Sequence, residues 1–328
     1  MFPADFAYAR ARSLDEALDL LGEAAQAGEE AKLIAGGQSL LPMMKLRLAA
    51  PQVLIDIAGL AELQGGPWDG HTRMIGALTT YRQLGRQRYV DRDGTPALVN
   101  GAPGFAAGIP ALADALAVLA DPQVRARGTI GGAVAHGDPA ADLPAVLLAL
   151  NAEVVIAARA GTREVILDDF LQGVYATDLA EDEIVTHVRV HTADARGGAY
   201  EKFPHPASHL PLVGVAAAVT FRGGRLTDSG GNVTDLNDGS IDRVAIAVTG
   251  ISPRPYRAHA AEAVLKGAFP APAALAAAAA QVTMAAPGSA DRVSLLGDQH
   301  ASADYRVHLA EVLTRRALAK ALTRGGRN

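Results

Sequence analysis

The chain has 328 residues, of which 49% are apolar and 20% are charged, and its formal net charge at pH 7 is −5. This length can bury more than one core, while the acidic balance and 5% aromatic content exclude the basic, base-stacking surfaces typical of nucleic-acid-binding proteins. The sequence contains no cysteine, which excludes disulfides, thiol catalysis and cysteine-ligated iron–sulfur clusters.

The first residues, MFPADFAYARARSLDEALDLL, carry acidic groups early and lack the basic and apolar regions of a signal peptide. The alanine-rich run at 273–286 is too short and too weakly apolar to cross a bilayer. We therefore expect a cytoplasmic protein without a membrane span.

The N-terminal third alternates short helical and extended segments. Apolar residues at helical spacing predict a helix over 14–21, with Ser13 as N-cap and Glu16 completing a capping box. A short apolar strand follows at 31–37 and ends in glycine, and a turn or helix is expected at 39–48. Residues 53–60 and 72–81 have the pattern of strands.

The middle of the chain predicts a helix at 109–121, an extended glycine-rich segment at 123–138, a helix at 142–151 and a strand with a hairpin-like partner over 152–171. After about Tyr175 the pattern changes to strands at 183–191, 214–221 and 243–251, followed by alanine-rich helical stretches at 257–286 and 303–323. A polar, glycine-rich stretch between two of these strands predicts a long loop or extended hairpin. This order indicates an α+β C-terminal domain.

Two glycine pairs, Gly36-Gly37 and Gly131-Gly132, stand in turns that we expect to follow strands and precede helices. A residue without Cβ lets the backbone approach a ligand closely, and exposed N–H groups at such a turn can bind phosphate oxygens. The hydroxyls of Ser39 and Thr129 could add donors, and Asp142 could accept from a sugar hydroxyl. Neither turn matches the dinucleotide or P-loop fingerprint, so the residues alone leave open a phosphate site or ordinary tight turns.

Four ordered segments extend this interpretation. AGGQSLLPMMKLRLA and ADPQVRARGTIGGAVAHGDPAADLPAVLLALNAEVV resemble the two flavin-binding motifs of the FAD-binding medium subunit of molybdenum hydroxylases, the carbon monoxide dehydrogenase-like branch of the xanthine dehydrogenase family. YEKFPHPASHLPLVGVAAAV and SADYRVHLAEVLTRRALAKAL resemble segments of that family's C-terminal domain. The resemblance covers nearly the whole chain.

The resemblance implies an α+β fold in two parts. The first is a two-lobed FAD-binding domain of the vanillyl-alcohol-oxidase (PCMH) type at 1–176, with lobes at about 1–57 and 58–176. The second is a carbon monoxide dehydrogenase flavoprotein-like C-terminal α+β domain at 177–328, with a long loop near 223–241.

The resemblance also implies which residues bind FAD. The expected set is Leu33, Ile34, Ala35, Gly36, Gly37, Gln38, Ser39, Leu40, Gly128, Thr129, Gly131, Gly132, Ala133, Asp142, Ile184, Val185 and Lys202. Asp142 matches a residue near the sugar, and Ile184 and Val185 match apolar contacts near the flavin ring. Three positions depart from the family pattern: Gln38 replaces a common histidine, Ala133 replaces Asn or Ser, and Leu210 replaces a tyrosine near the ring.

By this resemblance the chain carries electrons and has no catalytic acid or base. It would take electrons from the [2Fe-2S] clusters of a small subunit, which receives them from a large subunit with the molybdenum cofactor, and pass them to an external acceptor. The lack of cysteine fits this division, because the clusters must then lie on another chain. A dimer of heterotrimers is left open, and no nucleic acid partner is expected.

Two alternatives stay open, a free-standing FAD-dependent oxidase or reductase and a scaffold that has kept the fold but lost FAD. No metal site is nominated in this chain. His136, Asp138 and Asp142 match no specific ligand spacing, and His205 and His209 are interpreted as surface or partner-facing groups.

Overall fold

The computed structural model describes residues 2–67, 69, 71–85, 89–90, 96–97, 108–192, 197–222, 225–227, 233–235, 239–285 and 290–325. The chain divides into two compact units, and neither is one continuous stretch. The first unit contains Met1–Ala106, Leu119–Asp138 and Asn151–Val190, and the second contains Ala107–Val118, Pro139–Leu150 and His191–Asn328. Because each unit is assembled from separate stretches, the units do not test a single domain boundary at 176/177, which stays a prediction.

The first unit contains short helices and short strands. Its elements are β1 (Ala7–Arg10), α1 (Leu14–Ala27), β2 (Ala31–Ile34), α2 (Leu40–Lys45), β3 (Val53–Asp56), the 3-10 helix η1 (Ala61–Leu63), β4 (Thr72–Gly76), α3 (Tyr81–Leu84), β5 (Tyr89–Val90), β6 (Pro96–Ala97), α5 (Pro122–Arg127), α6 (Ile130–His136), β7 (Glu153–Ala158), β8 (Gly161–Ile166), α8 (Leu167–Phe170), β9 (Leu171–Gly173), β10 (Ala176–Thr177) and β11 (Ile184–His191).

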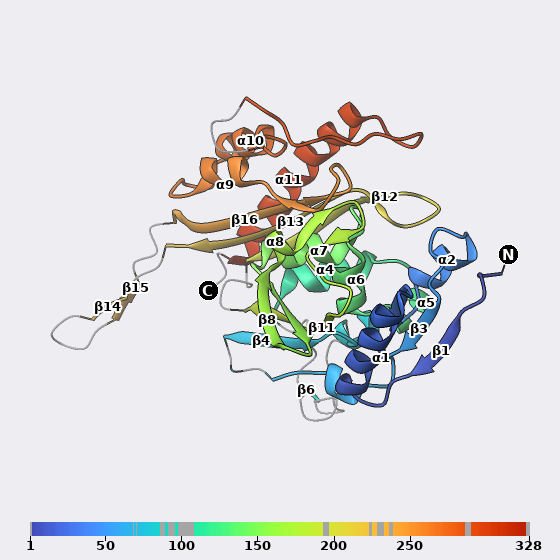
Figure 1. Cartoon of the computed structure of the whole chain (residues 1–328). Helices are drawn as coiled ribbons and strands as arrows, with labels where there is room; N and C mark the ends of the chain where they lie inside the picture. Colours follow the sequence, from blue (N-terminus) through green and yellow to red (C-terminus); the bar gives the residue numbers. More distant parts are fainter. Residues whose placement is uncertain are drawn as a thin grey trace. The chain divides into compact units, whose positions relative to one another are not determined.

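A three-stranded parallel sheet begins the first unit, in the order β1-β3-β2 (Figure 1). Val53 of the central strand stands opposite both Ala7 and Ala31. The apolar stripe of α1 packs with this sheet, and Leu18, Leu21 and Ile55 belong to one buried cluster. The helical spacing of α1 therefore matters because it turns its leucines toward the core.

A four-stranded sheet in the order β4-β11-β7-β8 forms the other part of the first unit. β11 pairs with β7, and β7 with β8, both in antiparallel registers. The hairpin expected over 152–171 is therefore confirmed for β7 and β8, whereas residues 167–170 form the short helix α8 instead of continuing the strand.

The second unit is a sheet with helices on both faces. Its elements are α4 (Pro110–Val118), α7 (Asp142–Ala149), β12 (Gly198–Pro204), β13 (Pro211–Phe221), β14 (Arg225–Thr227), β15 (Val233–Asp235), β16 (Ile241–Thr249), β17 (Tyr256–Arg257), α9 (His259–Leu265), α10 (Pro272–Ala280) and α11 (Ala303–Gly325). The sheet order is β12-β13-β16-β17, and every pairing is antiparallel.

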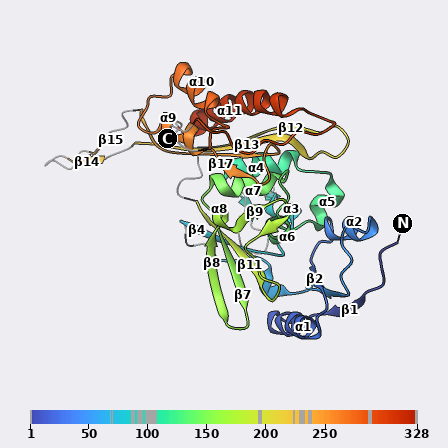
Figure 2. The ribbon, with the colours of Figure 1, turned by 45° about the horizontal axis from the view of Figure 1, so that its top comes forward.

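The two faces of this sheet carry different helices. Figures 1 and 2 show α9, α10 and α11 on one face, and α4 and α7 on the other. Most of β13 is buried on both faces, which explains its continuous apolar sequence, PLVGVAAAV. The alanines in this strand leave room for helices to pack closely against it.

Three local expectations need correction or qualification. The segment 123–138 is helical, not extended, because Asp121 caps α5 and Thr129 caps α6 through side-chain hydrogen bonds. At α1 the Ser13 hydroxyl accepts from the Glu16 N–H as expected, but the Glu16 carboxylate accepts from the N–H of Arg12, so the reciprocal half of the capping box is wrong. Most of the long loop expected near 223–241 lies outside the described residues, although β14 and β15 pair antiparallel there.

No helix among the described residues is both long and apolar enough to cross a membrane.

Candidate functional site

The first glycine turn, residues 35–39, connects β2 to α2 in the first unit. Gly37 has a φ of 72°, in the left-handed region where a side chain is strained. Ser39 precedes α2, and its hydroxyl makes no capping hydrogen bond to the helix. The turn and the residues beside it are half-buried or exposed, so a ligand could reach their backbone.

The backbone N–H groups of this turn are open. Among the hydrogen bonds of the described residues, none joins the N–H of residues 36–40 to a protein acceptor. Within the turn, the Gln38 side chain makes only a long contact of 3.5 Å, from its amide nitrogen to the carbonyl of Gly36. A left-handed residue in such a turn can direct successive N–H groups into one concavity that favours an anion. The first turn therefore fits the phosphate portion of FAD.

The second glycine turn, residues 128–133, connects α5 to α6 and uses its N–H groups within the protein. Ile130 donates to the carbonyl of Thr79 at 3.1 Å, and Gly131 to that of Ala77 at 2.9 Å. Gly132 donates to the Thr129 hydroxyl at 3.1 Å, and Ala133 to the Thr129 carbonyl at 3.0 Å. The expectation of exposed N–H groups is therefore wrong for these four residues, because the turn is folded onto the segment after β4.

The structure brings the two glycine turns together. A Cβ on Gly36 would lie 2.0 Å from the carbonyl oxygen of Arg127, so the first turn lies directly on the backbone that leads into the second. A Cβ on Gly131 would lie 2.4 Å from the Cβ of Ala77. By contrast, apart from its chain neighbours and the backbone of its own helix, a Cβ on Gly132 would meet a single atom of the described residues within 4 Å, the Thr129 hydroxyl oxygen at 2.8 Å. Gly36 and Gly131 are therefore required by packing, whatever the ligand.

Ile184 and Val185, also in the first unit, lie at the start of β11 and are 1% and 5% exposed. Ile184 belongs to the same buried cluster as Ile55 and Leu78. Their contact with a flavin ring stays a prediction, because their burial is already explained by the core.

The remaining two candidates, Asp142 and Lys202, belong to the second unit and form a buried ion pair. The Lys202 ammonium lies 2.9 Å from one Asp142 carboxylate oxygen, and the two side chains are 2% and 5% exposed. Lys202 also donates to the carbonyl of Val118 at 3.3 Å. In such a pair each charge offsets the cost of burying the other, since either charge alone would be costly to bury.

Sequence reasoning missed Tyr200, whose hydroxyl donates to Asp142 at 2.7 Å. Burial, and then the neighbouring Asp142 carboxylate, raise the pKa of Tyr200 well above its ordinary value. A signal was present in the sequence, because alternate residues of a strand share one face and Tyr200 stands two positions before Lys202 on β12. Asp142 is thus fully engaged in a structural network, and its bond to a sugar hydroxyl stays a prediction.

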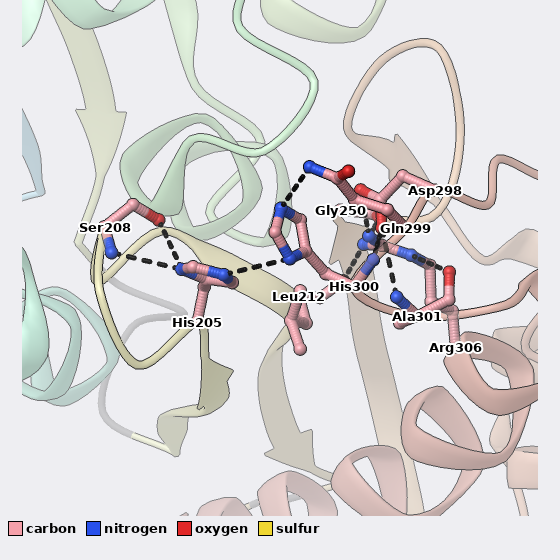
Figure 3. A network of polar contacts seen from close by, with 9 residues as sticks. All are labelled: His205, Ser208, Leu212, Gly250, Asp298, Gln299, His300, Ala301 and Arg306. Carbon is pink, nitrogen blue, oxygen red and sulfur yellow. Dashed lines mark hydrogen bonds and ion pairs between the residues drawn. The ribbon is translucent and has the colours of Figure 1, made fainter.

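His205 belongs to a polar network near the turn between β12 and β13 (Figure 3). Its Nε2 lies 3.3 Å from Nδ1 of His300, while its Nδ1 accepts from the N–H of Ser208 at 3.1 Å. Buried Arg306 donates to the carbonyls of Leu212 and Gly250 at 2.6 and 2.7 Å, which ties neighbouring loops together. Among the described residues no group of three or more His, Cys, Asp or Glu could hold a metal ion.

Known protein families match both parts of the chain. The family model described as the FAD binding domain in molybdopterin dehydrogenase matches residues 4–192. The model described as the CO dehydrogenase flavoprotein C-terminal domain matches residues 198–321.

Individual relatives match over nearly their whole length. The carbon monoxide dehydrogenase medium chain of Hydrogenophaga pseudoflava is 36% identical over 326 residues, covering 99% of both chains. The nicotine 6-hydroxylase medium subunit of Paenarthrobacter nicotinovorans is 34% identical over 314 residues, covering 96% of both. A solved structure of the Hydrogenophaga pseudoflava carbon monoxide dehydrogenase that lacks the Mo-pyranopterin moiety superposes with a TM-score of 0.82 and 38% identity, covering 99% of both chains.

Proposed function

The chain belongs to the family of FAD-binding medium subunits of molybdenum hydroxylases, and from this we propose that it transfers electrons within a heteromeric enzyme of that kind. It takes them from the [2Fe-2S] clusters of a partner subunit and passes them to an external acceptor. The fold is the family's two-part architecture, an FAD-binding domain followed by a flavoprotein C-terminal domain.

The open N–H groups of the first glycine turn are the observation that carries this proposal. They suit the phosphates of FAD, and the left-handed Gly37 and the uncommitted Ser39 hydroxyl lie in the same turn. The second turn supports the first through the contact between Gly36 and Arg127. Bound FAD would supply the redox chemistry, while the protein contributes binding and orientation.

The partners follow from the composition and from the relatives. A chain without cysteine has no thiolate to ligate an iron–sulfur cluster, so we assign the clusters to a partner. That this partner is a small subunit, and that a large subunit holds the molybdenum cofactor, is what the family resemblance implies. Similar chains are named as medium chains or subunits of dehydrogenases and hydroxylases, which supports an assembly of this kind. The chain alone would not turn over the organic substrate, and its cytoplasmic location stays a prediction.

Purification of the chain alone and after co-expression with its candidate partners tests the proposal. We expect the isolated chain to show flavin absorbance, to release FAD on denaturation and to be inactive toward reducing substrates of molybdenum hydroxylases. The co-expressed protein should contain iron, acid-labile sulfide and molybdenum, and should reduce an artificial acceptor in the presence of substrate.

Two outcomes would contradict the proposal in different ways. Turnover of an organic substrate by the isolated, flavin-loaded chain would favour a free-standing oxidase or reductase. A folded chain that neither contains FAD nor takes it up on incubation would favour a scaffold that has lost the cofactor.

A further inference from the structure

Two histidines of the second unit face each other from loops that are 95 residues apart in the chain (Figure 3). His205 begins the turn between β12 and β13, and His300 lies in the loop before α11. Nε2 of His205 is 3.3 Å from Nδ1 of His300, and the rings stand at 70° to each other with their centroids 4.4 Å apart. We call this contact the histidine clasp, because it joins the turn at 205–210 to the loop at 298–301.

The backbone of the turn determines which nitrogen of His205 carries the proton. Nδ1 of His205 accepts from the N–H groups of Ala207 and Ser208, at 3.3 and 3.1 Å. A ring nitrogen that accepts a hydrogen bond carries no proton, so neutral His205 has its proton on Nε2 and donates it to Nδ1 of His300. In the clasp both Nδ1 atoms must therefore be unprotonated.

The proton of neutral His300 is then on Nε2, at the far side of the ring from the clasp. This nitrogen lies 3.3 Å from the side-chain amide nitrogen of Gln299. A half-turn of that amide brings its oxygen into the same place, where it accepts from Nε2. The clasp is thus part of a chain of hydrogen bonds with one direction, from the backbone N–H groups of the turn to Gln299.

One additional proton must break either the clasp or the turn. If the proton binds Nδ1 of His300, two N–H groups face each other across 3.3 Å. If His205 moves its own proton to Nδ1 to restore the contact, that nitrogen no longer accepts from Ala207 and Ser208. A second additional proton places two positive charges on rings whose centroids are 4.4 Å apart. A free imidazole takes up its second proton near about pH 6.5, so these changes belong to the range around neutral pH.

Among the described residues no carboxylate is bonded to either imidazole, so none offsets these charges directly. Asp298, in the same loop as His300, accepts through one oxygen from the N–H groups of His300 and Ala301, and through the other from Arg306 at 2.6 Å. This carboxylate is therefore already used. The other titratable side chains on β12, in the turn and in the first turns of α11 make no polar contact with the two rings in the part of the chain that the structure describes: Glu201, Lys202, His209, Asp304, Tyr305 and His308.

We propose that the histidine clasp is a pH-sensitive switch of the second unit, independent of the function proposed above. Above about pH 7 both rings are neutral, and the clasp holds the turn at 205–210 to the loop at 298–301. Below about pH 6.5 protonation releases the turn, while the ion pair of Asp298 with Arg306 keeps the loop attached to α11. Exposed Leu210 and the preceding residues of the turn then become free to move.

A metal ion between the two rings explains the contact less well. If Nε2 of His205 ligated a metal, the proton of the neutral ring would have to lie on Nδ1. That nitrogen faces the N–H groups of Ala207 and Ser208, and two donors cannot share a hydrogen bond.

Hydrogen–deuterium exchange of the full chain tests the switch at pH 7.5 and 5.5, with EDTA present and with exchange times corrected for the intrinsic effect of pH. We expect the peptide that covers residues 204–210 to lose protection at least about tenfold at pH 5.5, the factor that one imidazole provides one unit below about pH 6.5. A peptide from β16, in the core of the same unit, should keep its protection at both pH values.

Three asparagine variants identify the titrating groups. His205→Asn removes the ring but can keep the turn, because an Asn side-chain oxygen accepts from backbone N–H groups nearby in the chain, and its exchange at 204–210 should no longer depend on pH. His300→Asn leaves one titrating ring in the clasp and should make the change smaller. His209→Asn is the matched control, since His209 lies in the same turn with a left-handed φ of 57° that Asn tolerates, and it should keep the full change.

Unfolding midpoints at pH 7.5 establish that each variant is folded, and if His205→Asn is not, His300→Asn makes the comparison alone. Equal corrected protection of the wild-type turn at the two pH values would overturn the proposal. So would a full change in a folded clasp variant, or its loss in His209→Asn, because another group would then be titrating. Parallel loss of protection in β16 would mean unfolding of the unit, and a pH effect that requires added Zn²⁺ would mean a metal site in place of the switch.

Discussion

The two glycine turns of the first unit have similar sequences but opposite hydrogen bonding. In the first, no protein acceptor is found for the N–H groups of residues 36–40 among the described residues. In the second, residues 130–133 all donate within the protein, to carbonyls of Thr79, Ala77 and Thr129 and to the Thr129 hydroxyl. The second turn therefore uses these donors within the protein, whereas the first leaves its donors available for the FAD phosphates that we propose bind there.

The difference shows that a glycine pair can be required for two separate physical reasons. Gly37 is required by its left-handed backbone in a turn with open N–H groups. Gly131 is required because a Cβ would collide with Ala77. A motif match cannot separate these reasons, although they predict different consequences of substitution.

The largest change in stability should come from substitution of Asp142. This residue is a candidate for cofactor binding, but its carboxylate is already bonded within the protein. Asp142→Ala leaves the buried Lys202 ammonium without its counterion, so we expect the free energy of unfolding to fall by about 3–5 kcal/mol. Urea denaturation measures this. The control is Asp142→Leu with Lys202→Met, which removes both charges and should recover much of the loss. A single variant with wild-type stability would show that the pair is not a structural one.

Gly36 should come next, because its replacement disturbs the contact between the turns. Gly36→Ala would place a Cβ 2.0 Å from the Arg127 carbonyl, and we expect a loss of roughly 3 kcal/mol together with loss of FAD. Gly132→Ala is the matched control, since outside its own helix and chain neighbours the described residues place just the Thr129 hydroxyl near its Cβ, and its stability should stay within about 1 kcal/mol of wild type. Loss of FAD from a folded Gly132→Ala protein would mean that the second turn also approaches the ligand.

Substitutions of the two turn hydroxyls should separate effects on stability from effects on FAD binding. Thr129→Val removes the cap of α6, so we expect about 1 kcal/mol less stability from chemical denaturation. Ser39→Ala removes a hydroxyl without a capping bond, so stability should be unchanged while FAD binding weakens by about 0.5–1.5 kcal/mol in a flavin titration. The opposite pattern, a destabilised Ser39 variant with normal FAD affinity, would reverse the roles we give to the turns.

The smallest expected effect is the dependence of the free energy of unfolding on pH. Burial lowers the pKa of His136 and of His187, both in the first unit. Below about pH 6.5 the unfolded chain therefore binds more protons than the folded chain, and the free energy of unfolding should decrease as pH falls from there toward the lowered pKa values. Urea unfolding at pH 7.5 and 5.5 measures the decrease, and His187→Gln should make it smaller. An unchanged decrease in that variant would exclude His187 as a contributor.

Much of the fold follows from local sequence. The stripe of leucines and the Ser13 cap predicted α1, and alternating or continuous apolar runs predicted β7, β8, β11, β13 and β16. The glycines of the segment 123–138 favour an extended prediction, but the capping residues Asp121 and Thr129 make it helical. Caps act locally, so this error could have been avoided from the sequence.

The sequence by itself determined the positions of the glycine pairs, the absence of cysteine ligands and, through ordered motifs, the family and its cofactor. Only the tertiary structure decided which pair keeps its N–H groups open, because the acceptors Thr79 and Ala77 lie far from the second turn along the chain. The same holds for Asp142, whose partners Tyr200 and Lys202 are 58 and 60 residues away. A hydrogen bond requires donor and acceptor to be close in space, and no local sequence pattern shows which distant group will pair with a given donor or acceptor.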